Sequence, residues 1–223
     1  MPHEGKTRIT LIRHGESNVT VDRILGGEKS CTGLSDLGRN QAQALRDRLS
    51  NEKTNINALY ASTMPRAMET AKIIQPVLNV DELLLDSELV EHRPGDADGK
   101  HYDELEKLFG ESDYYGRPHT SFATGAESLH GFHYRVSTAL ENLIGKHVGE
   151  SVMIVCHGGV IDVALRQLLD LPRRGQFDLW TLNTSLTEFV VGDAETKRGR
   201  WVLLRYNDHA HLAGLPFATN TDS

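Results

Sequence analysis

The sequence predicts an α/β protein, a three-layer α/β/α sandwich with a mostly parallel central sheet. Short apolar segments alternate along the chain with longer segments of helical periodicity, which is the pattern of successive βαβ units. Two of the short segments, residues 9–12 and 152–156, are rich in apolar and β-branched residues along their whole length. This favours strands that helices cover on both faces, as in a parallel sheet.

The first half of the chain is expected to contribute three strands and three helices. Ser35 is a typical N-cap, and Leu45 and Leu49 recur on one face of the helix that follows it. Pro65 suits the first turn of the next helix, where a backbone N–H is not needed. The strands are predicted at residues 7–13, 58–61 and 83–89, and the helices at residues 36–49, 65–77 and 102–109.

The second half is expected to add two helices and three strands. Residues 114–125 show no periodicity and contain Gly, Pro and aromatic residues, which predicts an ordered surface loop or lid. The tail after Asn207 is polar at its end and is expected to be loose. No change of composition marks a second domain, so residues 1–223 are predicted to form a single domain with its core at 7–206 and a tail at 207–223. The helices are predicted at residues 128–144 and 160–169, and the strands at 152–156, 186–191 and 200–206.

Charge and composition restrict the partners. The chain has 24 Lys and Arg against 31 Asp and Glu, a net charge of −7, which argues against nucleic-acid and anionic-membrane binding. An anionic ligand would therefore need locally concentrated positive charge. Cys31 and Cys156 are too few for a disulfide framework and are expected to be reduced. No apolar stretch is long enough for a membrane helix and the N-terminus lacks the apolar core of a signal peptide, so a soluble, cytoplasmic protein is expected.

Polar side chains are expected to meet at the carboxyl ends of two strands. Arg13 and His14 end the first strand, His157 follows the strand at 152–156, and each histidine precedes a glycine. Ligands of open α/β sheets bind at these strand ends. An arginine is a bidentate partner for phosphate or carboxylate, and a neutral imidazole beside it can attack phosphorus to form a phosphohistidine.

Two further features favour an anion site there. Arg66 falls in the first turn of a predicted helix, where a cation opposes the helix dipole unless it and the free N–H groups jointly hold an anion. Gly158 and Gly159 allow the backbone to approach a ligand closely. Alone, Arg66 fits an ordinary surface arginine and His157 a histidine in a turn; together with Arg13 and His14 they favour phosphate chemistry.

Five motifs follow one another along the chain. They are LIRHGES at residues 11–17, LSDLGRNQA at 34–42, YAS at 60–62 with RAMETA at 66–71, CHGG at 156–159 and NTS at 183–185. In this order they resemble the histidine phosphatase superfamily, the phosphoglycerate mutase-like proteins, over residues 7–206. The resemblance implies that His14 is the nucleophile and that Arg13, Arg66 and His157 surround the phosphoryl group.

The resemblance also implies a proton donor from a loop of the form Glu-x-x-x-Gly-x-x-x-Gly, which Glu91, Gly95 and Gly99 match. A carboxyl group near a dianionic phosphate has a raised pKa, so it can carry the proton that a leaving alkoxide needs. Glu88 and Glu16 are the alternatives. Glu91 is favoured because Glu88 is expected within a strand and Glu16 is expected to orient the His14 loop.

The sequence departs from the family pattern in two places. The family often has an asparagine six positions after the nucleophilic histidine, whereas this chain has Thr20 there and Asn18 two residues earlier. Either side chain can donate to a phosphate oxygen, so both remain candidates. The aromatic residue common in the Glu91 loop is missing from residues 94–98, which leaves the organic part of the substrate unidentified.

The predicted function is that of a phosphatase that hydrolyses phosphomonoesters of small metabolites through a phosphohistidine. The alternatives are a cofactor-dependent phosphoglycerate mutase and a non-catalytic phosphometabolite-binding module. The resembling mutases carry a long insertion with paired arginines after the Glu loop, whereas residues 100–126 hold only Arg117. The expected catalytic residues are His14, Glu91 and His157, and the expected phosphate-binding residues are Arg13, Arg66, Asn18, Thr20 and Gly158.

No metal or other cofactor is expected. His130 and His133 on a predicted helix, and His209 and His211 near the end, form pairs with too few ligands for a four-coordinate site. They are predicted to be solvated surface residues. The expected partner is a small-molecule phosphate ester rather than nucleic acid or membrane, and the oligomeric state is open, a homodimer included.

Overall fold

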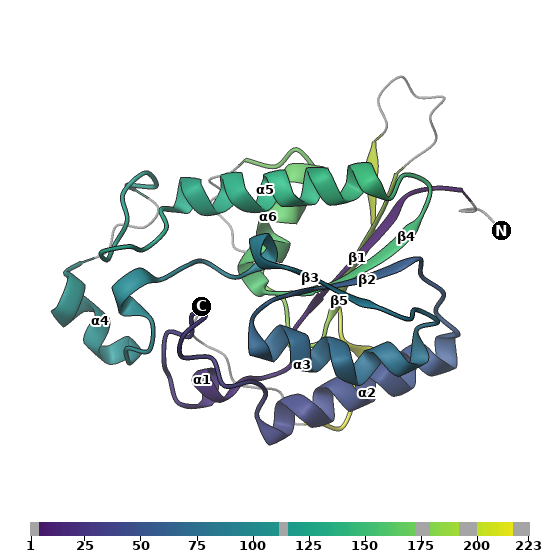
Figure 1. Cartoon of the computed structure of the whole chain (residues 1–223), viewed down its shortest axis with the longest axis horizontal. Helices are drawn as coiled ribbons and strands as arrows, with labels where there is room; N and C mark the ends of the chain where they lie inside the picture. The colour runs from purple at the N-terminus through teal and green to yellow at the C-terminus, as the bar shows by residue number, and fades with distance from the viewer. Residues whose placement is uncertain (1–4, 112–115, 173–178, 192–199, 216–223) are drawn as a thin grey trace.

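The computed structural model describes residues 5–111, 116–172, 179–191 and 200–215 of the chain, and these form a layered α/β structure around one sheet (Figure 1). The sheet has six strands in the order β3-β2-β4-β1-β5-β6. The strands are β1 (Arg8–Arg13), β2 (Ala58–Ser62), β3 (Leu83–Asp86), β4 (Ser151–Cys156), β5 (Leu186–Val191) and β6 (Trp201–Asp208).

Most of the sheet is parallel. β1 pairs with β4, β4 with β2, and β2 with β3, all in parallel. β5 runs antiparallel to β1, and β6 runs antiparallel to β5. β5 is therefore the one strand of the described sheet that opposes the others, and the predicted mostly parallel sheet is confirmed.

Helices cover both faces of the sheet (Figure 1). On one face, α2 (Asp36–Glu52) and α3 (Pro65–Ile74) pack on side chains that include Ile12. On the other, α5 (Leu129–Lys146) and α6 (Gly158–Leu168) pack on side chains that include Leu11. Successive residues of a strand point to opposite faces, so a strand apolar throughout supplies both cores. The three-layer arrangement predicted from the sequence is confirmed.

The helix starts follow the capping signals in the sequence. The Ser35 side chain accepts a hydrogen bond from the backbone N–H of Gly38, and Ser128 accepts one from Gly131. Pro65 is the first residue of α3. Each serine satisfies an N–H that its helix leaves without a partner, whereas proline has no N–H that would need one.

Two predicted elements end earlier than expected. α3 stops at Ile74, and a 3₁₀ turn at Gln75–Val77 replaces its last residues because Pro76 cannot donate a helical hydrogen bond. The strand predicted at residues 83–89 ends at Asp86, where the Asp86 side chain accepts a hydrogen bond from Glu88 N at 2.8 Å and closes a turn. Glu88 therefore lies in a 3₁₀ turn, not in a strand as predicted.

The prediction of a loose tail after Asn207 is wrong for its first part. Ala210–Leu212 form a 3₁₀ turn, and the Leu212 side chain is buried. Arg48 of α2 binds the Asp208 carboxylate with Nη1–Oδ1 and Nη2–Oδ2 distances of 3.0 and 2.6 Å. Residues 208–212 are thus held by an ion pair and by a buried apolar side chain, and their polar composition indicates neither. Residues 1–4, 114–115 and 216–223, which the predictions of the N-terminus, the surface loop and the tail include, lie outside the described residues.

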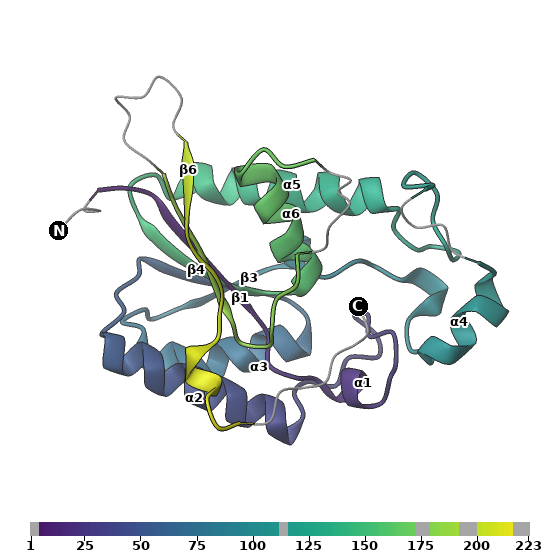
Figure 2. The same cartoon turned by 180° about the vertical axis from the view of Figure 1, so that it is seen from behind.

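Two short helices lie beyond the carboxyl ends of the parallel strands. α1 (Asn18–Val21) follows β1, and α4 (Tyr102–Phe109) sits at the same end of the molecule in both views (Figures 1 and 2). α4 is the helix predicted at 102–109, whereas α1 was not predicted. Arg23 and Asp103 form an ion pair between the two regions with an Nη2–Oδ1 distance of 3.1 Å. No helix in the described part of the chain is long and apolar enough to cross a membrane.

Candidate active site

Two histidines lie side by side where β1 and β4 end. The two strands are parallel neighbours in register, with Arg13 opposite Cys156, so His14 and His157 leave the sheet at the same level. The backbone N–H of His14 donates to the Cys156 carbonyl at 3.0 Å. The imidazole centroids are 5.1 Å apart, and both side chains are buried. Register thus brings together two residues that are far apart in sequence.

The hydrogen bonds of His14 fix its tautomer. Its Nδ1 lies 2.6 Å from the Gly15 carbonyl, which can only accept, so Nδ1 carries the proton. Its Nε2 lies 3.0 Å from Nε of Arg66, which can only donate, so Nε2 presents a lone pair. Burial and the charges of Arg66 and Arg13 hold the pKa of His14 well below its ordinary value. His14 is therefore a neutral imidazole with a free electron pair facing a guanidinium group.

Ser62, the last residue of β2, orients His157. Ser62 Oγ accepts from Met64 N at 3.2 Å and lies 2.8 Å from His157 Nε2. A hydroxyl has one hydrogen and two lone pairs, so this contact is compatible with either direction; we assign the Ser62 hydrogen to Nε2, which leaves the imidazole proton on the unpaired Nδ1. Burial, with the charges of Arg66 and then Arg13 and the neighbouring His14, holds the pKa of His157 well below its ordinary value. His157 is thus a neutral N–H donor.

The two arginines come from different elements. Arg13 ends β1, and its Nη1 donates to the Thr181 carbonyl. Arg66 lies in the first turn of α3, is buried, and donates from Nη1 to the Gly26 carbonyl at 3.0 Å. A Cβ added at Gly158 would lie 3.8 Å from Arg13 Nε and 3.9 Å from Thr181 Oγ1. These are ordinary contact distances, and they place the start of α6 beside both groups.

Five buried polar atoms at this end of the sheet have no hydrogen-bond partner within the described ranges. Two are Thr63 Oγ1 and Ser185 Oγ, and the three that lie in the histidine pair or beside Gly158 are Arg13 Nε, His157 Nδ1 and Thr181 Oγ1. Native proteins rarely leave buried donors unpaired, because each costs a desolvation penalty. Two of the three are donors, the third is a hydroxyl, and two guanidinium charges accompany them. The arrangement suits an anion with several oxygens, such as a phosphoryl group.

Glu91 reaches the same helix start from a loop. Its Oε2 accepts from Gly159 N at 2.9 Å and its Oε1 from His92 N at 3.0 Å. The alternatives are engaged elsewhere: Glu16 Oε1 accepts from Ser35 Oγ at 2.7 Å, and the half-exposed Glu88 pairs with Arg93. Of the three carboxylates considered from the sequence, Glu91 is the one bound to the His157-Gly158-Gly159 segment.

Asn18 and Thr20 make their hydrogen bonds within their own loop. Asn18 Nδ2 donates to Thr32 Oγ1 at 3.1 Å, and Thr20 Oγ1 pairs with Ser17 Oγ at 3.0 Å. The structure thus joins Arg13, His14, Arg66, His157, Gly158 and Glu91 by direct contacts or strand register, but shows no such contact for Asn18 or Thr20 among the described residues.

Several supporting residues lie within the motifs named above, but nothing in their spacing indicates which atoms they bind. Asn183 Nδ2 donates to the His14 carbonyl at 2.9 Å, Thr184 N donates to the Arg13 carbonyl at 2.8 Å, and Thr70 Oγ1 accepts from Gly15 N at 3.1 Å. These residues form hydrogen bonds with backbone atoms, and the fold decides which backbone atoms lie close to them. The NTS motif at 183–185 was the available hint for Asn183 and Thr184, as the YAS motif at 60–62 was for Ser62.

The paired histidines noted in the sequence gain no third metal-ligating neighbour within the described ranges. The described residues contain no group of three or more His, Cys, Asp or Glu side chains placed to hold a metal ion. The expectation that all four are solvated is wrong for His133, which is buried because it lies on the inner face of α5 with Phe132 and Val136. His211 is only partly exposed, with its Nε2 3.0 Å from Thr184 Oγ1. Cys31 and Cys156 are both free and buried.

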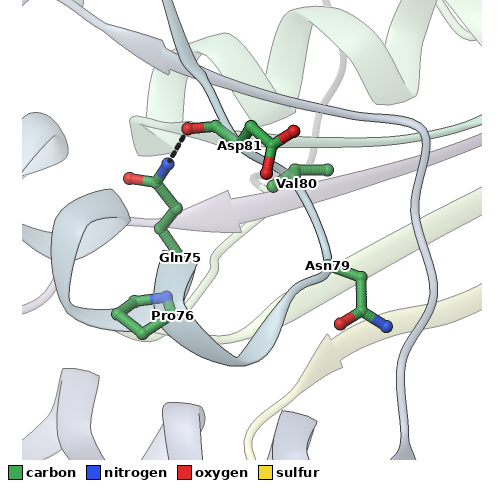
Figure 3. Close-up of a pocket in the computed structure, with 5 residues that line it drawn as sticks. All are labelled: Gln75, Pro76, Asn79, Val80 and Asp81. Carbon is green, nitrogen blue, oxygen red and sulfur yellow. Dashed lines mark hydrogen bonds between the residues drawn. The ribbon is translucent and has the colours of Figure 1, made fainter.

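A separate surface pocket follows the carboxyl end of α3 (Figure 3). The Gln75 side chain spans part of it by donating to the Asp81 carbonyl at 3.2 Å. Arg66 lies in the first turn of α3 and Gln75 follows its last, so the helix separates this pocket from the histidine pair. The lining residues are Gln75, Pro76, Asn79, Val80 and Asp81.

Known proteins match nearly the whole chain. The sequence model of the histidine phosphatase superfamily (branch 1) matches residues 9–209. Phosphoglycerate mutase-like protein 4 from Arabidopsis thaliana is 34% identical over 208 residues, which cover 92% of this chain and 86% of that protein. The metal-independent phosphoserine phosphatase of the same plant is 30% identical over 218 residues, which cover 95% of this chain and 85% of that protein.

Solved structures agree on the fold. Bacillus stearothermophilus YhfR superposes with a TM-score of 0.79 at 28% identity, covering 92% of this chain and 99% of that one. The native structure of a mycobacterial glucosyl-3-phosphoglycerate phosphatase superposes with a TM-score of 0.76 at 23% identity, covering 91% and 99%.

Proposed function

The chain belongs to branch 1 of the histidine phosphatase superfamily, and on this basis we propose that it hydrolyses phosphomonoesters of small metabolites through a phosphohistidine on His14. The observation that carries the proposal is the state of His14: a neutral imidazole whose Nε2 lone pair faces Arg66 beside buried, unpaired donors. Binding an anion needs the arginines alone, whereas an oriented nucleophile serves group transfer.

In the first step, His14 Nε2 attacks phosphorus in line with the leaving oxygen. The phosphoryl oxygens take over the Arg66 N–H that Nε2 accepts in the free protein, and they also accept from Arg13 Nε and His157 Nδ1. The N–P bond forms as the P–O bond breaks, and Glu91 transfers its proton to the departing alkoxide. The Gly15 carbonyl keeps the His14 proton on Nδ1 throughout.

In the second step, water attacks the phosphohistidine. Glu91, now a carboxylate, accepts a proton from that water, and the P–N bond breaks to return the neutral imidazole and free phosphate. The reaction needs no metal, since two guanidinium groups and two imidazoles provide charge and orientation. Asn18 and Thr20 remain candidates for further phosphate contacts through movement of their loop.

Hydrolysis is favoured over mutase chemistry by what lies between Gly99 and Glu127. This segment holds α4 and the single arginine Arg117, with no insertion bearing paired arginines for a substrate carboxylate. One relative from Arabidopsis has a mutase-like name and the other a phosphatase name. The experiment below distinguishes the two activities.

The test measures phosphate release from a panel of metabolite phosphate esters in the presence of EDTA. The wild-type chain is expected to release phosphate, and His14→Ala to lower kcat/KM by at least about 10³-fold. His119→Ala, at an exposed histidine, is the matched control and should retain activity. Retention of most activity by His14→Ala would rule out the mechanism. Fast isomerisation of 3-phosphoglycerate in the presence of a bisphosphoglycerate primer, with little release of free phosphate, would identify a mutase. Binding of phosphate esters without turnover would identify a binding module.

A further inference from the structure

A buried arginine of α5 lies behind the loop that presents Glu91. The side chain of Arg135 is 6% exposed. Its Nη1 donates to the carbonyls of Glu88 at 2.7 Å and Val90 at 3.1 Å, and its Nη2 donates to the Glu91 carbonyl at 3.3 Å. One guanidinium group therefore holds three carbonyls within four consecutive residues.

Glu127 completes this contact from the segment before α5. Arg135 Nε and Nη2 donate to Glu127 Oε1 and Oε2 at 2.9 and 2.8 Å, a bidentate ion pair. Glu127 N donates to the Arg93 carbonyl at 2.8 Å, Arg93 N donates to Glu127 Oε2 at 3.4 Å, and the Glu127 carbonyl accepts from His92 Nε2 at 2.6 Å. The Arg135–Glu127 pair thus contacts the backbone on both sides of Glu91.

The loop needs such support because it lacks regular structure. Residues 91–94 belong to no helix or strand, so no hydrogen-bond ladder fixes their backbone. Glu91 itself is held at its carboxylate by Gly159 N and at its carbonyl by Arg135. A proton donor must lie within hydrogen-bond distance of the atom it protonates, and a misplacement of about 1 Å can cost about 100-fold in rate.

From these contacts we infer that Arg135, together with Glu127, is a positioning residue that sets the Glu91 carboxyl group for proton transfer to the leaving oxygen. The inference rests on the proposed function, in which Glu91 is the general acid. Arg135 contacts neither His14 nor His157 in the described structure and acts through the Glu91 backbone. Lysine cannot replace it, because an ammonium group has no planar fork to bind a carboxylate and three carbonyls together.

The test compares two substrates that differ in their need for an acid. β-Glycerophosphate releases an alkoxide that must be protonated, whereas p-nitrophenyl phosphate releases a stabilised phenolate. Arg135→Lys is expected to lower kcat/KM for β-glycerophosphate by about 10- to 100-fold and for p-nitrophenyl phosphate by less than about threefold. The ratio of the two is the readout, since kcat/KM reports the phosphorylation step and a general loss of folded protein lowers both equally.

Arg166→Lys is the matched control. Arg166 on α6 is 8% exposed by side chain, pairs with Asp162 at an Nε–Oδ2 distance of 2.7 Å and donates to the Pro172 carbonyl at 2.7 Å. It is equally buried and ion-paired but does not contact the Glu91 loop in the described structure. Its replacement should leave the substrate ratio at the wild-type value. An equal loss on both substrates in Arg135→Lys would overturn the inference.

A double-mutant cycle separates positioning from simple structural support. Glu91→Gln should show the selective loss itself, and Arg135→Lys should add less than about threefold to it on β-glycerophosphate, because both changes remove the same proton transfer. Additive losses would overturn the inference. If Arg135→Lys does not fold, Glu127→Gln must show the selective loss instead, and its absence there counts equally against the inference.

The two proposals fail differently. If Glu91→Gln shows no selective loss on β-glycerophosphate, Glu91 is not the general acid. Both its assigned role and the inferred role of Arg135 are then wrong. If Glu91→Gln is selective and Arg135→Lys is not, the proposed function stands and only the role of Arg135 is wrong. Activity that survives His14→Ala contradicts the proposed function whatever the substrate ratio shows.

Discussion

The two buried imidazoles must be neutral for the proposed chemistry, and their surroundings enforce this. His14 is surrounded by low-dielectric core and two guanidinium groups, so a further positive charge is unfavourable. His157 experiences the same charges from the next strand. A protonated His14 would have no lone pair on Nε2 and could not attack phosphorus. In the proposed mechanism, the arginines assigned to the phosphoryl group therefore also keep the proposed nucleophile neutral.

We predict that the His14 and His157 imidazoles stay neutral at pH 6 in the free protein. Burial first, and the neighbouring arginines next, hold both pKa values well below the ordinary value of about 6.5. Imidazole ¹⁵N NMR should show the Nδ1–H, Nε2-lone-pair pattern for His14 at that pH. Signals that titrate near pH 6.5 would contradict the prediction.

The lowered pKa values of His14 and His157 also make the free energy of unfolding depend on pH. Below about pH 6.5 the unfolded chain binds protons at these histidines while the folded protein does not, so the free energy of unfolding falls as the pH drops. Each histidine contributes at most about 1.4 kcal/mol per pH unit, between about 6.5 and its lower folded pKa. Urea unfolding of His14→Gln should accordingly show a shallower loss of stability in this window than the wild type.

The sequence was informative about residues whose role follows from chemistry at a strand or helix end. Arg13 ends a strand, His14 and His157 directly follow strands, and Arg66 lies in the first turn of a helix, so their meeting could be predicted. Arg135 was not singled out, because its role depends on three carbonyls that only the fold brings to it. Polar residues that bind the backbone leave no pattern of spacing.

At the level of elements, the start of α6 depends on the absence of a side chain at Gly159. A Cβ added at Gly159 would lie 2.3 Å from Glu91 Oε1 and 3.0 Å from Phe132 Cζ. The nearer atom is the end of a flexible side chain, so an added methyl group displaces the carboxylate more readily than the helix. Glycine here serves the close approach of a carboxylate to a helix N-terminus.

Gly159→Ala is therefore predicted to separate activity from stability. The free energy of unfolding should change by less than about 1 kcal/mol, because the helix propensity of alanine offsets the crowding. kcat/KM for β-glycerophosphate should fall by about 10-fold or more, since Glu91 loses its hydrogen bond to Gly159 N. Denaturant unfolding and steady-state kinetics on the same preparation measure both.

The matched control is Gly145→Ala within α5. An added Cβ there meets no atom within 4 Å. This variant should be more stable by about 0.5 to 1 kcal/mol and fully active, because alanine is the better helix former. Unimpaired activity in Gly159→Ala, or equal losses in both variants, would contradict the assigned role of the Gly159 site.

Long apolar and periodic elements were predictable, and short ones were not. The strands and the five longer helices follow from apolar runs, leucine stripes and caps that recur over several residues. α1 has four residues and no side-chain cap at Ser17, so it offers no such signal. The end of β3 depends on one hydrogen bond from Glu88 N to Asp86, which no periodicity encodes.

At the scale of the whole molecule, the sequence predicted the layers but not the order of the strands. β1 lies between β4 and β5, whose sequences are far from its own, and β5 runs antiparallel to it. Pairing of this kind depends on contacts that are remote along the chain. The docking of residues 208–212 on α2 was missed for the same reason.

Occupation of the site should stabilise the entire fold, because its groups come from both sides of the sheet. Arg13 is the last residue of β1 and His157 follows β4, Arg66 belongs to the α2–α3 layer, and α5 supports Glu91. An oxyanion that binds only the folded protein adds about 2.7 kcal/mol at 100 times its Kd. For a chain of this length that corresponds to a rise of about 5 to 10 °C in Tm.

Orthovanadate should therefore raise Tm in a concentration-dependent way, as followed by differential scanning fluorimetry. Arg66→Met should weaken vanadate binding by about 10- to 100-fold, the loss expected when charge-assisted hydrogen bonds are removed. Arg39→Met is the control, because it removes the same charge from a surface ion pair with Glu69 and should leave the vanadate shift intact. An equal vanadate shift in Arg66→Met and the wild type would place the anion elsewhere and leave the unpaired donors of Arg13 and His157 without the partner assigned to them.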